Sequence, residues 1–498
     1  FFFQAEDGIR DCLLSRGSEM CIRDRCKYVW YYLCKKFTIF LNRLGHLDNQ
    51  KNKIEVELNG FSGYEIKHSK EVDDEITRIG PGTKAGEYLR RYWHPIFISS
   101  ELADLPVAIK ILGEELVLFR DKSKQLGLVH KHCPHRQASL EFGICQTNGI
   151  SCCYHGWHFD VDGSILDVPG QSEHTQEIIK EKVRLGAYPT HEFKGLIFAY
   201  LGPIDQKPEF PMYDSLNFDD MEMVPYKAPF ECNWLQVLDA IVDPIHTSFL
   251  HSNMSRQQFS EGFGEVGQIE FVERDSWILG CNTRRVGDNV WFRINEVVLP
   301  NFTQAGSAFQ ADGTKEILYG RSSFTRWVVP IDDETTICYA WANFGDRGDP
   351  PEYNTPEGPE LIEQGEIFDR PYEERQRFPA DREACEGMGP INIHKNENLV
   401  ASDQGVAMMR QRIREQIRSL ADGKEPYKVT DLKESPIPTY GGDSVINIPK
   451  IDEGEDSLFS KLAKEFIKIQ FEVDGKTEKE RIEIVSNKLV EIQSRENS

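Results

Sequence analysis

The sequence has no apolar run of the roughly 18–20 residues that a membrane-spanning helix needs. The longest candidate, Tyr28–Leu41, is interrupted by Lys35 and Lys36. An excess of positive charge is also absent, because the formal net charge is -23. Nucleic acids and anionic lipids are themselves negative, so this charge argues against non-specific binding to either. We expect a cytoplasmic protein that binds neither membranes nor nucleic acid.

A dense cysteine framework is absent too. The 12 cysteines are spread irregularly over 498 residues, unlike those of a small disulfide-bonded secreted domain. They fit reduced thiols, a minority of which serve as metal ligands. The sequence contains neither a plant-type ferredoxin cysteine cluster nor a Gly-rich nucleotide-binding loop.

The first 25 residues, Phe1–Arg25, show no periodicity and none of the basic, apolar and small-residue zones of a signal peptide. They resemble strings that arise when sequencing-adapter DNA is translated in frame with a gene. We therefore expect residues 1–25 to be a non-native, adapter-derived segment, with a disordered native extension as the alternative. Residues 26–74 are expected to be an N-terminal extension of uncertain origin.

Short apolar runs alternate with turns over residues 75–205, after a helix within Glu75–Tyr92, and this pattern predicts a small all-β domain. Its expected strands are Val107–Leu112, Glu115–Phe119, Leu126–His130 and Gly195–Leu201.

Residues 206–430 follow a proline-bearing connection and combine strands with helices at Asn233–Ser252 and Asp403–Leu420. The strands expected there are Gln268–Val272, Ser276–Arg285, Val290–Leu299, Glu316–Val329 and Thr335–Phe344. The remaining residues, 431–498, are expected to form a helical tail with helices at Ser457–Phe471 and Thr477–Glu496.

Metal-binding residues gather first in Cys133-Pro-His135 and, after sixteen intervening residues, in Cys152-Cys153-Tyr154-His155. Zinc accepts a Cys2His2 set, so the ligand types alone do not decide the metal. Zinc fingers usually keep Cys with Cys and His with His, whereas each loop here supplies one of each. That arrangement favours a Rieske [2Fe–2S] cluster, which has two thiolates on one iron and two imidazoles on the other.

A second group lies in Asp243-Pro-Ile-His246-Thr-Ser-Phe-Leu-His251. Two imidazoles and one carboxylate suit ferrous iron when the remaining coordination positions stay open for O2 and substrate. On an ideal helix, side chains five positions apart diverge by roughly 140°. His246 and His251 could then hardly meet at one metal, so we expect a wide, π-type turn or a break between them. Pro244 lacks an N–H and crowds the preceding turn, so we also expect the helix to be disturbed before His246.

Together these motifs resemble the oxygenase (alpha) component of Rieske non-haem iron aromatic ring-hydroxylating oxygenases, and in particular the phthalate dioxygenase family. The resemblance covers about residues 75 to 420 and includes Ile76-Thr-Arg-Ile-Gly-Pro-Gly-Thr and Trp327-Val-Val-Pro-Ile-Asp-Asp. Two departures are Asp239, where relatives often have Glu, and Asn392-Ile393-His394, where an Asp-Arg pair is expected. Because of these two departures, the local packing or the oligomer contacts of the family cannot be carried over to these positions.

The resemblance implies roles for individual residues. Cys133, His135, Cys152 and His155 would hold the Rieske cluster, with Cys153 as a packed neighbour. Apart from the resemblance, we expect His130, His132 and His158 to be bystanders, either structural or exposed. A mononuclear Fe(II) would be held by His246, His251 and Asp381, the last within Asp381-Arg-Glu-Ala-Cys-Glu-Gly. The alternatives for this carboxylate are Glu383, Glu386 and, less favoured, Asp403. Asp243 would be the acidic bridge that accepts a hydrogen bond from a Rieske-site histidine.

The same resemblance implies an α+β fold, in which an all-β Rieske domain precedes a helix-grip (START-like) catalytic domain with an antiparallel sheet. It also implies a homotrimer or a multiple of it, and a separate NAD(P)H-dependent reductase of flavin or ferredoxin type. The implied reaction is O2-dependent mono- or dihydroxylation of a small aromatic-like substrate. O- or N-demethylation is the alternative reaction. A Rieske electron carrier and a zinc-bound structural protein are the alternatives from other classes.

Overall fold

The computed structural model describes residues 62–218, 220–254, 257–355, 370–431 and 436–498. The residues from His68 to Ser498 form one compact unit. The expected adapter-derived segment lies outside the described residues, as does most of the expected N-terminal extension. None of the helices in the described ranges is long and apolar enough to span a membrane. The boundaries expected for the later domains, at 205 and 430, remain predictions.

Between residues 93 and 200 the chain forms three small antiparallel sheets, ordered β1-β11-β10, β2-β3-β4-β9 and β5-β6-β7-β8. Strand β3 shows why this region folds as layers. Leu116 and Leu118 pack into one hydrophobic core, while Val117 and Phe119 pack into another, because successive side chains point to opposite faces. The strands are β1 Trp93–Ile98, β2 Val107–Ile111, β3 Glu114–Arg120, β4 Leu126–His130, β5 Ile144–Cys145, β6 Ile150–Ser151, β7 His158–Phe159, β8 Ile165–Asp167, β9 Ala187–Tyr188, β10 Thr190–Phe193 and β11 Leu196–Tyr200.

A large antiparallel sheet follows, in the order β12-β18-β17-β16-β15-β14-β13, with β19 also paired to β15. Strand β12 contains Pro225 and Pro229, which an edge strand tolerates because one side of its backbone needs no partner. The strands are β12 Met221–Phe230, β13 Gln268–Arg274, β14 Trp277–Val286, β15 Asn289–Val298, β16 Phe302–Ala305, β17 Phe324–Pro330, β18 Thr336–Gly345 and β19 Gly442–Asn447.

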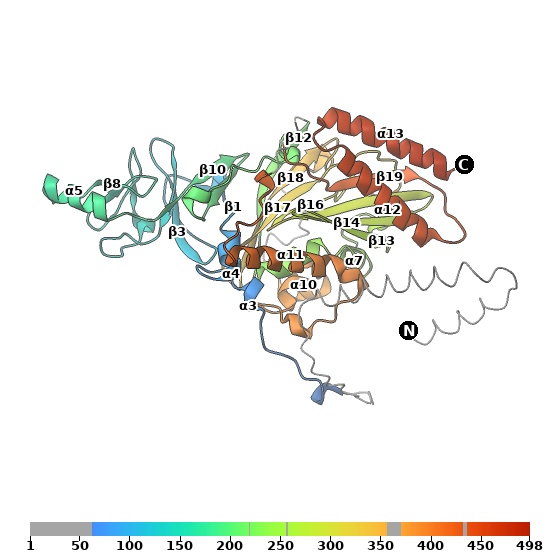
Figure 1. Ribbon diagram of the computed structural model, residues 1–498, viewed down its shortest axis with the longest axis horizontal. Helices are drawn as coiled ribbons and strands as arrows, with labels where there is room; N and C mark the ends of the chain where they lie inside the picture. Colours follow the sequence, from blue (N-terminus) through green and yellow to red (C-terminus); the bar gives the residue numbers. More distant parts are fainter. Residues whose placement is uncertain (1–61, 219, 255–256, 356–369, 432–435) are drawn as a thin grey trace. The chain divides into compact units, whose positions relative to one another are not determined.

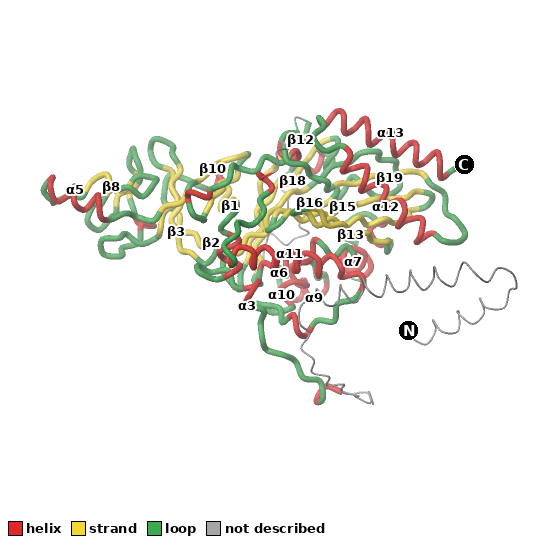
Figure 2. Tube along the Cα trace, in the orientation of Figure 1, coloured by secondary structure: helices red, strands yellow, loops and turns green. Residues whose placement is uncertain are grey.

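Helices cover both faces of the large sheet (Figures 1 and 2). On one face Phe466 of α12 stacks on Phe292 of β15, with ring centroids 4.9 Å apart. On the other face lie α6, α7, α10 and the long helix α11, and Gly280 of β14 leaves room for Pro244 there. The α-helices are α3 Asp74–Thr77, α4 Lys84–Leu89, α5 Glu173–Lys182, α6 Trp234–Ile241, α7 Ile245–Ser248, α9 Tyr372–Arg377, α10 Asp381–Gly387, α11 Gln404–Ala421, α12 Glu455–Glu472 and α13 Glu478–Glu496.

Two expected elements differ from the structure. The strand expected over Glu316–Val329 is wrong in its first half, because the strand β17 begins only at Phe324. Before it, the side chain of Arg321 donates hydrogen bonds to Thr439 and Asp214 instead of lying in a regular strand. The single helix expected over Asn233–Ser252 is divided. Helix α6 ends at Ile241 and α7 begins only after Pro244, so the disturbance expected at Pro244 is confirmed.

Candidate metal centres

Two loops carry the first group of candidate ligands, and their backbones have the same hydrogen-bond pattern. The N–H of Cys133 donates to the carbonyl of Ala138, and the N–H of Gln137 donates to the carbonyl of Cys133, both at 2.9 Å. The second loop repeats these two bonds at the same spacing around Cys152, at 2.8 and 2.9 Å. Gln137 and Gly156 occupy equivalent places and share a left-handed backbone, with φ of 61° and 72°. The two half-motifs are therefore equivalent turns that face each other.

These turns bury the two cysteines and expose the two histidines. Cys133 is 1% exposed and Cys152 is 3% exposed, whereas His135 and His155 are exposed with ring centroids 4.7 Å apart. Burial, with Cys152 adding to it, raises the pKa of the Cys133 thiol to about 11, against backbone hydrogen bonds from His135 and Arg136. A buried thiol pair with amide donors aimed at it is a setting in which a positive metal centre stabilises thiolates.

This donor set fits a two-iron cluster and not a single zinc ion. The ligands of one tetrahedral zinc lie within about 4 Å of one another. The two cysteines and two histidines do not form a group whose ligand atoms all lie within 4.8 Å. A thiol pair inside and an imidazole pair outside match the two different irons of a Rieske cluster. Cys153 is exposed, whereas Cys152 lies against Cys133.

The three nearby histidines contact other groups of the protein. A ring nitrogen of His132 lies 3.1 Å from the carbonyl oxygen of Gln137, and His158 contacts the carbonyl of Asn148 at 2.5 Å. His130 lies 3.8 Å from a carboxylate oxygen of Glu114. These contacts agree with the expectation that the three are bystanders and not cluster ligands.

The second group of candidate ligands depends on an irregular helix. After α7 the chain forms a π-helical turn, Phe249–Asn253, in which the N–H of Met254 donates to the carbonyl of Phe249 at 2.9 Å. This wide turn brings His251 toward His246, and their ring centroids lie 5.2 Å apart. The spacing argument is confirmed: a regular helix would have turned the two imidazoles away from each other.

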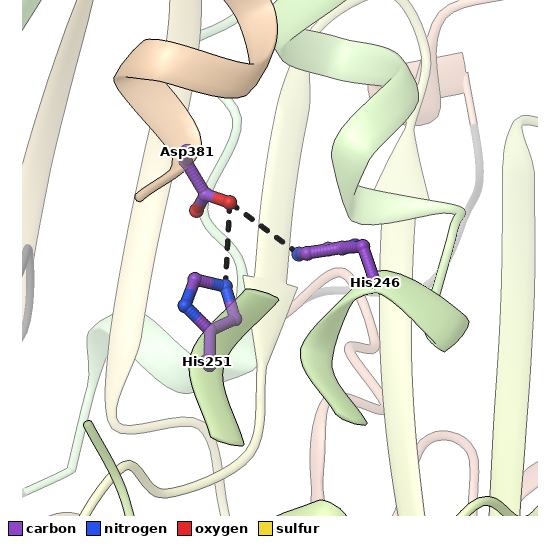
Figure 3. A group of neighbouring side chains, drawn as sticks. All are labelled: His246, His251 and Asp381. Atoms are coloured by element: carbon purple, nitrogen blue, oxygen red, sulfur yellow. Dashed lines mark ion pairs between the residues drawn. The ribbon is translucent and has the colours of Figure 1, made fainter. Parts of the chain in front are cut away.

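Asp381 completes this group as the first residue of α10 (Figure 3). Its Oδ1 lies 3.5 Å from Nε2 of His246 and 3.3 Å from Nε2 of His251. Among the residues that the structure describes, these three are the group of His, Cys, Asp or Glu ligands whose atoms all lie within 4.8 Å. Two imidazole nitrogens facing one carboxylate fit a facial triad for ferrous iron.

One side chain of α6 explains how a residue so far downstream reaches the histidines. Nε2 of Gln236 donates to the carbonyls of Cys385 (2.8 Å) and Gly389 (3.0 Å), and its Oε1 accepts from the N–H of Asn392 (2.9 Å). Gln236 therefore fixes α10 and the following loop against the helix that precedes His246. The sequence showed Gln236 within the Asn233-Trp-Leu-Gln stretch, but nothing local marked it as the residue that joins the two segments.

The alternative carboxylates are engaged elsewhere. Glu383 pairs with Arg370 (2.5 Å) and Arg375 (2.6 Å), and Glu386 pairs with Arg375 (2.7 Å) and Arg382 (2.9 Å). Asp403 accepts the N–H of Val400 at 2.7 Å near the start of α11. Of the four candidates, Asp381 is the one that the structure brings to the two histidines.

Electrostatics favour an ionised Asp381. Burial opposes ionisation, but His251, His246 and Arg326 outweigh it and hold the pKa of the carboxyl below its usual value. The other ring nitrogen of each histidine has an acceptor: Nδ1 of His246 contacts the carbonyl oxygen of Asp243, and Nδ1 of His251 lies 2.5 Å from Oε1 of Gln258. Such contacts place the proton on Nδ1 and direct the lone pair of Nε2 toward the group, where it could bind a metal.

A cavity adjoins the triad. Its apolar lining includes Ile241, Phe259, Phe263, Ala305, Ala308 and Phe324. Besides the triad, four polar side chains line it: Thr247, Arg293, Asn295 and Arg326. Arg293 is held by Asp443 of β19, with Nη1 3.1 Å from each carboxylate oxygen, and by the carbonyls of Gly306 and Ser307. The sequence did not indicate this contribution from β19.

The two departures from the family pattern lie in one buried network. Arg410 of α11 donates to both Asp239 (2.5 Å) and Glu397 (2.6 Å), and Asn392 also donates to Glu397 (2.6 Å). Burial raises the pKa of Asp239, although Arg410 pulls it down. His394 lies 3.6 Å from Asp73. Asp239 and the segment Asn392-Ile393-His394 therefore take part in local packing that joins α6 to α11.

Known proteins share these features. Residues 92–189 match the Rieske [2Fe-2S] domain family. The oxygenase subunit of tert-butanol monooxygenase / tert-amyl alcohol desaturase from Aquincola tertiaricarbonis is 39% identical, over 87% of this chain and 96% of that protein. Phenoxybenzoate dioxygenase subunit alpha from Ectopseudomonas oleovorans is 34% identical, over 72% of this chain and 87% of its own length.

A crystal structure of dicamba monooxygenase bound to dicamba has the same fold, with a TM-score of 0.52 at 17% identity, and it covers 68% of this chain and all of that one. The expected fold, an all-β Rieske domain followed by an antiparallel-sheet domain with helices, is confirmed. The identities to the two curated relatives extend over most of the chain, well beyond the Rieske domain. The protein therefore belongs to the Rieske non-haem iron oxygenases, as an oxygenase component with a Rieske [2Fe–2S] cluster and a mononuclear non-haem iron as its cofactors.

Proposed function

We propose that this oxygenase hydroxylates, once or twice, an aromatic or related small organic substrate in the cavity beside His246, His251 and Asp381. The observation that carries the proposal is the position of this triad on the wall of a mainly apolar cavity. Apolar walls bind a substrate by excluding water, and a few polar groups then fix its orientation. Oδ1 of Asn295 is buried without a hydrogen-bond partner among the described residues and would accept a substrate donor.

In this proposal Cys133, His135, Cys152 and His155 hold the Rieske cluster, and the triad holds Fe(II). When bound, the two centres supply electrons and the activation of O2. The protein itself supplies position and exclusion of water. Phe259 and Phe324 are among the apolar side chains that line the cavity, while the hydroxyl of Thr247 donates to the carbonyl of Pro244 (2.7 Å) and does not compete for the substrate.

Asp243 is proposed as the acidic bridge between the two kinds of site. Its carboxylate is about one-third exposed, and Oδ1 accepts the N–H of Ile245 at 3.2 Å. The carbonyl of the same residue holds Nδ1 of His246. One residue thus orients an iron ligand through its backbone while its side chain stays accessible to a histidine of a Rieske site.

We also propose a homotrimer, or a multiple of it, in which the cluster of one subunit serves the iron of its neighbour. The exposure of His135 and His155 supports this, because a protein surface is where a neighbour or a reductase can make contact. The electron donor would be a separate NAD(P)H-dependent reductase. The boundaries proposed for the two domains are 75–205 and 206–430, followed by the tail 431–498.

Demethylation of a methoxyaromatic or methylamine substrate is the alternative within the family, since the same iron apparatus serves it. A pure electron carrier is disfavoured, because it would need no His-His-Asp triad and no cavity. The relative named for tert-butanol supports adding small tertiary alcohols to the substrates tested.

The decisive experiment is product analysis by mass spectrometry with a surrogate reductase and labelled O2. The panel should contain aromatic acids, methoxyaromatics and small tertiary alcohols. Label in a new hydroxyl group supports hydroxylation, whereas formaldehyde with an unlabelled phenol indicates demethylation. Reduction of the cluster with no product and no O2 uptake across the whole panel would contradict the proposal.

A further inference from the structure

The two ligand histidines are oriented in different ways. His246 is held by the backbone carbonyl of Asp243, three residues earlier, which no substitution can remove. His251 is held by a side chain, Gln258, whose Oε1 lies 2.5 Å from its Nδ1. Metal binding through Nε2 requires the proton to sit on Nδ1, and the amide oxygen is the atom of Gln258 that accepts it.

Gln258 is tied to His251 through its backbone as well. Its N–H donates to the carbonyl of His251 at 2.9 Å, so the two residues are joined by a main-chain and a side-chain contact. Nε2 of Gln258 is buried with no hydrogen-bond partner among the described residues. The contact with the imidazole is therefore the one described bond that orients this amide.

The position of the next residue adds a second consequence. Phe259 packs on His251 with ring centroids 5.4 Å apart and also lines the cavity. The π turn alone gives His251 its general direction, but rotation of the ring about its bonds stays open. The hydrogen bond to Gln258 and the ring contact with Phe259 both restrict that rotation.

We propose that Gln258 is a positioning residue that holds His251 in the tautomer and orientation needed to bind iron. The inference rests on the proposed role of His251 as an iron ligand. Removing such an outer contact typically weakens metal binding by about 10–100-fold. Because the acceptor is a neutral amide, a carboxylate in its place would keep the contact and add a negative charge beside the site.

The test uses the full chain with its Rieske cluster, freed of mononuclear iron, and measures the dissociation constant for added Fe(II) by anaerobic calorimetry. Gln258→Leu should weaken Fe(II) binding by about 10–100-fold and leave the Rieske spectrum unchanged. Gln258→Glu should bind Fe(II) at least as tightly as the wild type. The matched control is Gln257→Leu, because Gln257 donates to the carbonyl of Phe259 (2.8 Å) in the same loop, and this variant should bind normally.

Unchanged Fe(II) binding in Gln258→Leu would overturn the inference, and so would an equal loss in Gln257→Leu, which would indicate general damage to the loop. If Gln258→Leu does not fold, Gln258→Glu decides: tight binding supports the inference and a tenfold loss contradicts it. His251→Ala separates this result from the proposed function. If that variant still binds Fe(II) normally, the ligand assignment fails and not merely the role of Gln258.

Discussion

The two metal-binding regions differ in where their ligands come from and in how much water reaches them. The first draws all four candidate ligands from two equivalent loops between residues 133 and 155, closed by their own backbone hydrogen bonds. The second joins a π turn to the start of a distant helix, and His251 is only 3% exposed while His135 and His155 are open to solvent. A site that exchanges electrons benefits from exposure, whereas one that activates O2 benefits from exclusion of water.

The supports of the two regions differ as well. Backbone bonds hold the first, so side-chain changes elsewhere should disturb it little. The second depends on side chains from several segments, among them Gln236, Gln258 and Arg410. The first region is therefore encoded locally, and the second is encoded by tertiary packing.

The largest expected effect tests the local region. Cys152→Ala should abolish the Rieske absorption and electron paramagnetic resonance spectra together with all turnover, because a thiolate ligand is lost. Cys153→Ala is the matched control and should keep both, since that side chain is exposed. The opposite pattern, with the cluster lost only in Cys153→Ala, would shift the register of the motif.

The second largest effect is expected from a change that removes only the mononuclear iron site. Asp381→Ala should remove the mononuclear iron, lowering iron content by about a third, and stop turnover while the Rieske spectrum persists. Glu383→Gln should retain that iron, because Glu383 faces Arg370 and Arg375. Iron loss in the Glu383 variant with full iron in the Asp381 variant would reassign the carboxylate. Total iron measured beside the Rieske spectrum distinguishes these outcomes.

A subtler change should separate the two regions functionally. Asp243→Asn is expected to keep both metal centres and yet lower turnover at least about tenfold, because the proposed acidic bridge is lost while the backbone contact to His246 remains. Iron content, reduction of the cluster and product formation would be measured in one preparation. Normal turnover with O2 uptake still coupled to product would contradict the role of Asp243.

The smallest expected effect concerns the sheet beneath the second region. Burial raises the pKa of Glu296 to about 7, although backbone N–H groups of Gly441 and Tyr440 favour its charged form. The folded state therefore binds this proton more tightly than the unfolded state, and stability should fall as pH rises from about 4.5 to about 7. The loss is about 3 kcal/mol at most.

Glu296→Gln should remove this dependence, because the amide is neutral throughout and can still accept from Tyr440 and Gly441. Tryptophan fluorescence reports largely on the large sheet, whose strands contain Trp277, Trp291, Trp327 and Trp341, and bleaching of the cluster reports on the first region. Only the fluorescence midpoint should depend on Glu296. Equal pH dependence in wild type and variant would show that another group is responsible.

Sequence patterns predicted the elements whose information is local. The strand expected at Leu126–His130 and the long helix near its expected ends at Asp403–Leu420 agree with β4 and α11 within one or two residues. The π turn followed from the spacing of His246 and His251, since two ligands of one metal must point to one place.

The missed elements depend on partners that a local pattern does not contain. Strand β12 carries two prolines and is stable as an edge strand only because β18 lies beside it. Strand β19 is short and begins with glycine, and it exists through its pairing with β15. Gln236 and Gln258 are ordinary polar residues in the sequence and gain a role only when the fold brings them to α10 and to His251.

Strand β19 has a consequence for the order in which the enzyme is made. Arg293 is 6% exposed and depends on Asp443, which the ribosome adds 150 residues later. A growing chain can close the cluster loops early, because all their contacts are already synthesised, and domains generally fold in that order. The cavity wall around Arg293 can form only after Asp443 has been synthesised, since a buried cation without its carboxylate is unstable by about 3–5 kcal/mol. Premature termination before Asp443 would therefore leave a cluster-binding domain attached to an unfinished catalytic one.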